Sequence, residues 1–411
     1  MKAVVVGGGL AGLAAALELV DQGHAVTLLE ARPTLGGAVQ TLPRREGDPE
    51  PPPDNGQHIA LGCFSSYLRF LERIGSASGV RRIALRLPVI DERGRVSTIG
   101  YGAGPLLRYS HVPVRDRVRI LLLLARLPRL EAGDGTFGDF LRARGQSDLA
   151  IERFWDVFIR PALNLSTDEV AAADAAFTVL TALRSGRAAS EVVLPAAPLG
   201  ELHGVAARRA LEAAGATVMT GERVSDLDEL DADAVLVALP PEESARLLGE
   251  PDPKLEPSPI ASVHLLFDRR ILRHELAALL GSDAHWVFDR GVLTGQPPPR
   301  GQYLTVVSSG VPDLMELRGR ELVSLLVQQL VERLGPAELL WSRVSREPEA
   351  TIALRPGVER PAAGRVREGL ARAGAWTRTE ERWPPTMENA VRSGIAAARA
   401  VSAGVATKVP A

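Results

Sequence analysis

The chain has little of several residue types, and each scarcity excludes a class of protein. Its 411 residues include a single cysteine, Cys63, which excludes an intrachain disulfide and a CxxC-type zinc or iron–sulfur site, and we expect no metal. No segment reaches the ~18–20 consecutive apolar residues that a membrane-spanning helix needs. The net charge is −2, from 48 basic and 50 acidic residues, and provides no strong positive field for general nucleic-acid binding.

The rest of the composition is that of a globular protein with a large core. Hydrophobic residues make up 45% of the chain and charged residues 24%, and a chain of this length is expected to form two domains. The apolar N-terminus is broken by Gly7, Gly8, Gly9 and Gly12, which a secretory signal peptide would not need. We therefore expect a cytoplasmic protein.

The first thirty residues have the pattern of a dinucleotide-binding unit. Residues 2–6 form a β-branched run typical of a buried parallel strand, and a helix-forming stretch over residues 13–23 ends at Gly23. Residues 25–30 predict a second strand that ends in Glu30. Gly7-x-Gly9-x-x-Gly12 lies between the first strand and the helix. Because all these elements occur in order, the pattern predicts a bound dinucleotide rather than a turn without a ligand.

The glycines of this unit have separate expected roles. Gly7 permits the tight turn, Gly9 lets the backbone approach a pyrophosphate, and Gly12 lets the helix pack closely on the strand. We expect the phosphates at the N-terminus of this helix, where unpaired N–H groups and the helix dipole favour anions, and we count Leu10 and Ala11 among the cofactor-binding residues.

The residues after the second strand indicate which dinucleotide binds. Glu30 lies 18 residues after Gly12, where a carboxylate can accept hydrogen bonds from ribose hydroxyls. Glu30-Ala31-Arg32, followed by Leu35-Gly36-Gly37, resembles the flavoprotein signature of the amine oxidase and phytoene desaturase superfamily, which implies FAD. In that superfamily the acidic segment closes over the ribose and phosphates, and the glycine pair passes close to the flavin. An arginine usually follows the pair; here it is Ala38, which leaves Arg32 and backbone N–H groups to meet the phosphate charge.

Two later stretches are expected to complete the nucleotide-binding sheet. Residues 204–213 predict a helix, and residues 216–224 and 231–241 predict strands, the second of which stops at a proline pair. The resemblance implies that the backbone near Val224 meets the adenine and that the second strand ends beside the cofactor.

The C-terminal stretch predicts a helix that starts near Thr386, after Pro384 and Pro385. The resemblance implies that its N-terminus, with Thr386, Met387 and Ala390, points at the flavin ring. There the helix dipole would stabilise negative charge on reduced flavin. Ala375 stands where the superfamily has an aspartate, so the usual ribityl contact is missing or replaced.

Together these features predict an α/β protein with a Rossmann-like FAD-binding domain built from residues 1–78, 196–247 and 363–411. The inserted pieces, 79–195 and 248–362, would form the substrate domain. There, residues 258–268 and 302–309 predict strands of a mixed sheet and residues 316–334 a helix. The proline-rich residues 43–53 predict a mobile loop.

A more specific resemblance rests on several separated stretches. Asp54-Asn55-Gly56-Gln57-His58 and Gly186-Arg187-Ala188-Ala189-Ser190 occur together with Phe154-Trp155, Pro161 to Asn164 and the segment after Trp383. This set resembles the bacterial squalene-associated FAD-dependent enzymes, the hydroxysqualene dehydroxylases of hopanoid biosynthesis, along essentially the whole chain. The resemblance implies reduction of hydroxysqualene to squalene, a long-chain isoprenoid. Further cofactor-binding residues implied by it are Asn55, Gly56 and Gln57.

Replacing an allylic hydroxyl by hydrogen requires a hydride, which reduced flavin can deliver, and an acid for the departing oxygen. Asp54 and His58 are the candidates for the acid, with Asp54 favoured because a carboxylate suits a cationic intermediate. In the alternative interpretation, Asp54 and Gln57 hold the loop. Since no second strand–GxGxxG–helix unit is present for a nicotinamide cofactor, we expect an external electron donor.

Residues 115–130 predict a basic, apolar helix, which is either an interfacial helix on an anionic membrane or an ordinary half-buried one. Two other functions remain open. A polyene desaturase or amine oxidase would work in the oxidative direction, although four tyrosines and nine phenylalanines make no obvious aromatic cage for an amine. A non-catalytic flavin or lipid carrier is the other.

Overall fold

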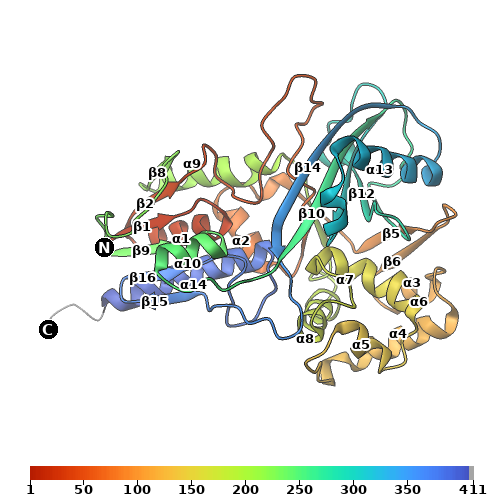
Figure 1. Cartoon of the computed structure of the whole chain (residues 1–411), viewed down its shortest axis with the longest axis horizontal. Helices are drawn as coiled ribbons and strands as arrows, with labels where there is room; N and C mark the ends of the chain where they lie inside the picture. The colour runs from red at the N-terminus through yellow and green to blue at the C-terminus, as the bar shows by residue number, and fades with distance from the viewer. Residues whose placement is uncertain (407–411) are drawn as a thin grey trace.

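The computed structural model describes residues 1–406, which form two halves that lie side by side (Figure 1). Six strands form the sheet of the first half: β1 (Lys2–Val6), β2 (Ala25–Glu30), β8 (Thr217–Thr220), β9 (Ala234–Val237), β15 (Gly364–Arg367) and β16 (Leu370–Arg372). Their order is β15-β16-β9-β1-β2-β8. All neighbours pair in parallel except β15, which runs antiparallel to β16 at one edge.

These six strands come from three separated stretches of the chain. This confirms the predicted α/β class and the discontinuous Rossmann-like sheet. The exact domain boundaries stay a prediction, and residues 407–411 of the last predicted segment lie outside the described residues.

The helices of this half are α1 (Leu10–Asp21), α2 (Ser65–Arg73), α9 (Ala206–Ala213), α10 (Pro241–Leu248) and α14 (Met387–Ala406). Helices α1 and α14 pack against each other in parallel. Gly394 of α14 faces Ala11 so closely that a Cβ at Gly394 would lie 2.1 Å from the Ala11 carbonyl oxygen. Further along both helices, Arg399 pairs with Glu18 at 2.8 Å. The two helices therefore present their N-termini to the same side of the sheet.

The second half contains a seven-stranded sheet and a group of helices. The strands are β5 (Arg86–Ile90), β6 (Val96–Gly100), β10 (Pro257–Phe267), β11 (Leu276–Leu279), β12 (Trp286–Asp289), β13 (Gln302–Ser309) and β14 (Leu339–Ile352). Their order is β14-β10-β13-β12-β11-β5-β6. A small third sheet, β3-β7-β4, consists of β3 (Ala60–Leu61), β7 (Val192–Pro195) and β4 (Val80–Ile83).

Successive side chains along a strand point to opposite faces of the sheet, and in the large sheet one face is apolar and the other is polar. Val263, Leu265, Leu304 and Val306 belong to the apolar cluster that packs under α13 (Gly319–Leu334). On the other face, His264 pairs with Thr305 on one side and Arg343 on the other, and Ser262 pairs with Ser345. On this same face, β12 and β11 carry apolar side chains, which form an apolar area next to the polar one.

That apolar area packs against the helical group. The helices are α3 (Ala103–Arg108), α4 (Val114–Arg126), α5 (Phe137–Arg142), α6 (Asp148–Ala150), α7 (Asp156–Leu163) and α8 (Ala172–Val179). Trp286 and Phe288 of the sheet share one cluster with Phe154 and Trp155 of the helices. Two short helices, α11 (Arg290–Thr294) and α12 (Pro312–Glu316), complete this half.

The structure differs from the sequence-based expectations at four places. The strand predicted over 231–241 is β9 alone, which ends at Val237, and Pro241 already begins α10. The strand predicted over 216–224 ends at Thr220, because Gly221 turns the chain with a φ of +81°. The helix predicted over 316–334 is α13 alone, and residue 316 ends α12. The loop 43–53 is anchored despite its prolines, since Asp48 forms a buried ion pair with Arg343.

Within residues 1–406, no helix has both the length and the apolar character needed to cross a bilayer.

Candidate functional site

The glycine turn after β1 brings three segments of backbone into close contact. A Cβ at Gly12 would lie 1.8 Å from the Gly7 carbonyl oxygen, and one at Gly7 would lie 2.3 Å from the carbonyl oxygen of Ala238, just after β9. Neither position accepts a side chain. The N–H groups of Leu10, Ala11 and Gly12 precede the first intrahelical bond of α1, from Leu13 N to Gly9 O. They are the donors that a phosphate would need.

The predicted glycine pair lies directly on this turn. Gly36 donates to the Gly8 carbonyl at 2.8 Å, and a Cβ at Gly37 would lie 2.8 Å from the Cα of Gly9. Gly37 also has a φ of +60°, which favours glycine. The two glycine segments therefore form one backbone cradle.

Glu30, at the end of β2, has its carboxylate beside the cradle. One oxygen accepts from the Gly8 N–H and the other from the Arg32 N–H, both at 2.7 Å. Ala31 and Arg32 are exposed, and Gly221 donates to the Arg32 carbonyl at 3.1 Å. That bond places the segment after β8, which contains half-buried Val224, at the same edge as Glu30. An acid, a glycine cradle and free helix N–H groups at one edge fit a dinucleotide.

Ala38 and Asn55 are brought together by hydrogen bonds. The Asn55 amide donates to the Ala38 carbonyl at 2.6 Å, and the Asn55 backbone N–H donates to the Gln40 carbonyl at 3.0 Å. Asn55 is buried, whereas Ala38 is exposed and Gln57 is half-buried. Asn55 therefore fixes the backbone after the glycine pair.

The predicted C-terminal helix begins where expected. The Thr386 hydroxyl accepts from the Asn389 N–H at 3.3 Å, which caps the first turn of α14. Because α14 runs parallel to α1 and Gly394 lies over Ala11, its start at Met387 lies about 10 Å beyond that contact, at ~1.5 Å per residue. Ala390 and Met387 pack into the core of this half.

Two residues of this helix were missed in the sequence. The buried Glu388 carboxylate accepts from the N–H groups of Ser66 and Tyr67, at 3.1 and 2.8 Å, and so caps the N-terminus of α2. The buried Asn389 donates to the carbonyls of Ala375 and Thr377, which holds the segment where the aspartate is absent. No local signal indicates either contact, because the partners are distant in sequence.

Asp54 is buried, and both of its carboxylate oxygens have partners. Arg290 approaches one oxygen at 2.8 Å, while the Thr41 hydroxyl and the Leu199 N–H donate to the other at 2.7 and 3.0 Å. Arg290 is itself buried and also donates to the Pro52 carbonyl. This geometry favours the alternative interpretation of Asp54, in which it holds the loop.

His58 has a different environment. Its Nδ1 is buried and has no hydrogen-bond partner among the described residues. Burial lowers the pKa of His58, while the nearby Asp54 charge and the Gly56 backbone oppose that shift. His58 is therefore a neutral imidazole with an unused nitrogen.

Two further histidines lie near this loop, and hydrogen bonds fix their tautomers. His203 Nδ1 lies 2.9 Å from the Leu199 carbonyl and must donate to it, so Nε2 accepts from the Tyr67 hydroxyl at 2.8 Å. His264 Nε2 donates to the Asp54 carbonyl at 2.8 Å. Burial lowers the pKa of each histidine to about 3, so both are neutral at pH 7.

The polar face of the large sheet lies against the loop 54–58 and has spare hydrogen-bonding capacity. The buried Ser262 Oγ, Tyr303 hydroxyl and Arg290 Nε have no partner among the described residues. Ser262 lies next to the loop, because a Cβ at Gly56 would come within 2.9 Å of its hydroxyl.

The two sequence stretches that carry the more specific resemblance meet at the third sheet. β3, just after His58, pairs with β7, and Cys63 donates to the Ala189 carbonyl at 2.9 Å. Burial raises the pKa of Cys63 to about 12, so the thiol stays protonated and is poorly suited to covalent attachment of a flavin.

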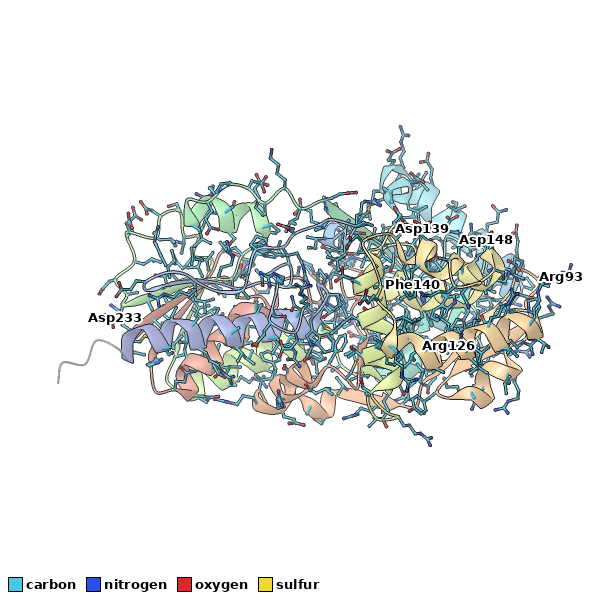
Figure 2. The ribbon with its side chains drawn as sticks, turned by 90° about the horizontal axis from the view of Figure 1, so that it is seen from below. Arg93, Arg126, Asp139, Phe140, Asp148 and Asp233 are labelled. Carbon is cyan, nitrogen blue, oxygen red and sulfur yellow. The ribbon has the colours of Figure 1, made fainter. Side chains whose placement is uncertain are left out.

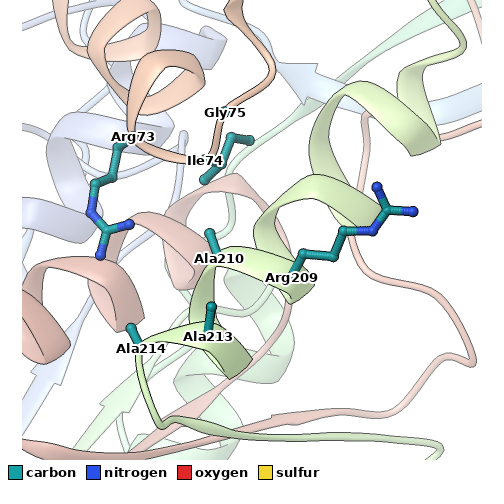
Figure 3. Close-up of a pocket in the computed structure, with 7 residues that line it drawn as sticks. All are labelled: Arg73, Ile74, Gly75, Arg209, Ala210, Ala213 and Ala214. Atoms are coloured by element: carbon teal, nitrogen blue, oxygen red, sulfur yellow. The ribbon is translucent and has the colours of Figure 1, made fainter.

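A surface hollow of about 440 Å³ lies away from this site (Figure 3). It opens at the C-terminal ends of α2 and α9 and is lined by Arg73, Ile74, Gly75, Arg209, Ala210, Ala213 and Ala214. Arg73 is already paired with Asp21 at 2.6 Å. None of the predicted site residues lines this hollow.

Comparison with known proteins gives the same fold. The family model described as "Flavin containing amine oxidoreductase" matches residues 10–402. An oxidoreductase structure from Methanosarcina mazei superimposes with a TM-score of 0.76, at 20% identity, covering 96% of this chain and 99% of that one.

Two kinds of curated protein are similar to this chain. The hydroxysqualene dehydroxylase of Sinorhizobium fredii is 27% identical over 96% of both chains. A probable zeta-carotene desaturase of Synechococcus elongatus is 24% identical over 98% of both chains. The zeta-carotene desaturase of Zea mays is 27% identical over 179 residues, which span 38% of this chain and 31% of that protein.

Proposed function

Because this chain belongs to the family of flavin containing amine oxidoreductases, we propose that it is a hydroxysqualene dehydroxylase, which reduces hydroxysqualene to squalene. Family membership makes the protein an FAD-dependent oxidoreductase. The observation that carries the finer assignment is the similarity to the Sinorhizobium fredii hydroxysqualene dehydroxylase along 96% of both chains. A long-chain isoprenoid is then the substrate, and hopanoid or other triterpenoid biosynthesis is the setting.

The surroundings of the loop 54–58 support an apolar substrate. Ile59 and Leu61, directly after the loop, pack against the cluster that contains Trp155 and Phe288. The loop thus lies at the boundary between the polar area of the large sheet and the apolar core of the helical group. Such a boundary suits a hydrocarbon with a single hydroxyl group.

The residues that would hold FAD are those of the backbone cradle and its neighbours. The segment from Gly7 to Gly12, Glu30 and the backbone near Val224 would bind its ADP half. Gly36, Gly37 and the N-terminus of α14 would lie by the flavin. When bound and reduced, FAD supplies the hydride that the substrate carbon needs.

The leaving hydroxyl also needs a proton, so that hydride and proton together convert the alcohol into hydrocarbon and water. We assign a proton relay to His58: its unpartnered Nδ1 would take up a proton from solvent and pass it to the leaving hydroxyl, whereas the Asp54 carboxylate is fully occupied. Asp54 then positions the loop through Arg290, Thr41 and Leu199. An external donor would supply the electrons.

An anaerobic half-reaction tests this function. The purified protein would be reduced with dithionite and mixed with hydroxysqualene, while the flavin absorbance is followed and squalene is measured by gas chromatography. We expect the flavin to reoxidise as squalene appears. A flavin that stays reduced would contradict the dehydroxylase assignment, and a colourless protein would favour a carrier.

The second candidate is a polyene desaturase, which the similarity to the Synechococcus elongatus protein over 98% of both chains favours. In that case oxidised flavin would be bleached when a carotene precursor is added without dithionite. Bleaching by an amine instead would favour an amine oxidase.

His58→Gln is expected to lower dehydroxylation at least tenfold with FAD still bound.

A further inference from the structure

An exposed apolar area lies on the helical group, on one side of α4. Eleven large apolar side chains of the described residues are exposed, and six of them lie within residues 96–122. On α4, Val114, Val118 and Leu122 recur every four residues and form one stripe, and Val114 is 64% exposed. Leu107 of the neighbouring α3 is also exposed. We call Leu107, Val114, Val118 and Leu122 the α4 stripe.

Exposed arginines run beside this stripe. Arg115, Arg119 and Arg126 follow the stripe residues along the helix, and Figure 2 shows Arg126 at the end of α4. Residues 114–129 contain five arginines and one aspartate, a local charge of +4 in a chain whose net charge is −2. The aspartate, Asp116, is buried under the helix and lies 3.8 Å from Arg115 and 3.9 Å from Arg119.

The neighbouring acids do not cancel this charge. Ser147, at the start of α6, donates to Asp116, and the adjacent Asp148 is paired with Arg142 at 2.8 Å. Arg117 is turned inward and donates to the carbonyls of Val112 and Leu107. The outer arginines therefore remain available for anionic groups.

We propose that the α4 stripe docks this protein on the surface of a membrane that contains anionic phospholipid. The apolar side chains would enter the acyl boundary, and the flanking arginines would bind lipid phosphates. The helix would lie in the plane of the membrane, because its 13 residues span only about 20 Å of a hydrocarbon core of about 30 Å.

The opposite side of α4 supports this orientation. Ile120 and Leu123 pack into the cluster shared with Trp286 and Phe288 of the large sheet. One helix therefore separates the proposed membrane surface from the apolar core beside the site. The docking proposal concerns the surface alone and stands whichever apolar substrate the enzyme uses.

Vesicle sedimentation tests the proposal with the FAD-bound protein. Vesicles would contain either phosphatidylcholine alone or phosphatidylcholine with ~30% phosphatidylglycerol. We expect the wild type to sediment with the anionic vesicles and to be released by high salt, because salt screens the arginine–phosphate attraction. Leu122→Gln and Arg119→Gln should each lower vesicle binding at least fivefold.

Two matched variants control for general surface effects. Leu340 on β14 is 50% exposed, as is Leu122, so Leu340→Gln removes an equal apolar side chain elsewhere. Arg209, exposed at the hollow in Figure 3, provides Arg209→Gln as the charge control. Both controls should bind vesicles as the wild type does. The bound-flavin spectrum of every variant should match the wild type, which shows that each has folded.

Three results would overturn the proposal. The first is a wild type that binds neither kind of vesicle. The second is equal loss of binding in the stripe variants and the controls. The third is a wild-type dimer in size-exclusion chromatography that Leu122→Gln converts to a monomer without changing vesicle binding, because the stripe would then cover a second copy of the chain.

Discussion

Replacing Arg290 with methionine tests whether Asp54 holds the loop or supplies a proton. The Asp54 and Arg290 side chains are 2% and 3% exposed and lie 2.8 Å apart. Methionine keeps an apolar stem but removes the charge, which leaves the carboxylate with the Thr41 hydroxyl and the Leu199 N–H. Removing one partner of a buried ion pair costs roughly 3–5 kcal/mol, because the other charge stays desolvated.

The double variant separates pairing from other effects. Asp54→Asn keeps an oxygen that accepts from Thr41 and Leu199, but it leaves the Arg290 guanidinium buried without its counter-charge, so this variant should also lose roughly 3–5 kcal/mol of stability. With both changes, no unpaired charge remains, and the loss should be about 2 kcal/mol smaller than the sum of the single losses. Arg73→Met, which breaks an ion pair with Asp21 at the surface, should cost only about 0–1 kcal/mol.

Urea titration of the FAD-bound protein, followed by tryptophan and flavin fluorescence, would give the free energies of unfolding. Turnover of hydroxysqualene would be measured on the same preparations. Additive losses would refute the buried pair. Wild-type stability with bound FAD but no turnover in Asp54→Asn would refute the positioning role and restore Asp54 as the acid.

Three other predictions follow from the same geometry. Gly12→Ala should lower FAD affinity more than tenfold in fluorescence titration, because the new Cβ would meet the Gly7 carbonyl oxygen at 1.8 Å, whereas Gly319→Ala, with open space around it, should leave it unchanged. Glu30→Gln should weaken FAD binding about 5- to 20-fold in the same titration, since a charge-assisted hydrogen bond is worth more than a neutral one. Burial lowers the pKa of His203 to about 3, below the ~6.5 of an unfolded histidine. The contribution of the neutral His203 to stability is therefore complete above pH 6.5. It is lost as the pH falls toward 3, by about 1.4 kcal/mol per pH unit. Between pH 7 and pH 5, the free energy of unfolding measured by urea titration should fall less for His203→Gln than for the wild type. Equal falls would contradict this assignment.

Much of the nucleotide-binding half could be predicted from the sequence because its geometry is local. The turn from Gly7 to Gly12, the helix after it and Glu30 all belong to one strand–helix–strand unit, whose spacing decides where the acid lies relative to the turn. The α/β class and the discontinuous sheet follow from the same hydrophobic patterns. The start of α14 was predicted from its proline pair.

The environment of the loop 54–58 could not be predicted in this way. The sequence predicted Asp54 as an acid, but its partner Arg290 is 236 residues away, and no residue near either one indicates the pairing. In the sequence, nothing distinguishes His203 from the other histidines, because its hydrogen-bond partner Tyr67 is 136 residues away. Glu388 is read as an ordinary helix residue, although it caps α2 at a separation of 321 residues.

The sequence by itself determined the glycine turn from Gly7 to Gly12, the acid at the end of β2 and the basic apolar character of α4, since each depends on neighbours within a few turns or one strand. Only the tertiary structure decided that the Asp54 carboxylate is occupied, that His58 keeps an unused nitrogen and that the stripe on α4 faces outward. The physical reason is that burial, charge pairing and hydrogen-bond partners depend on which distant segments pack together. Local propensity does not encode that information.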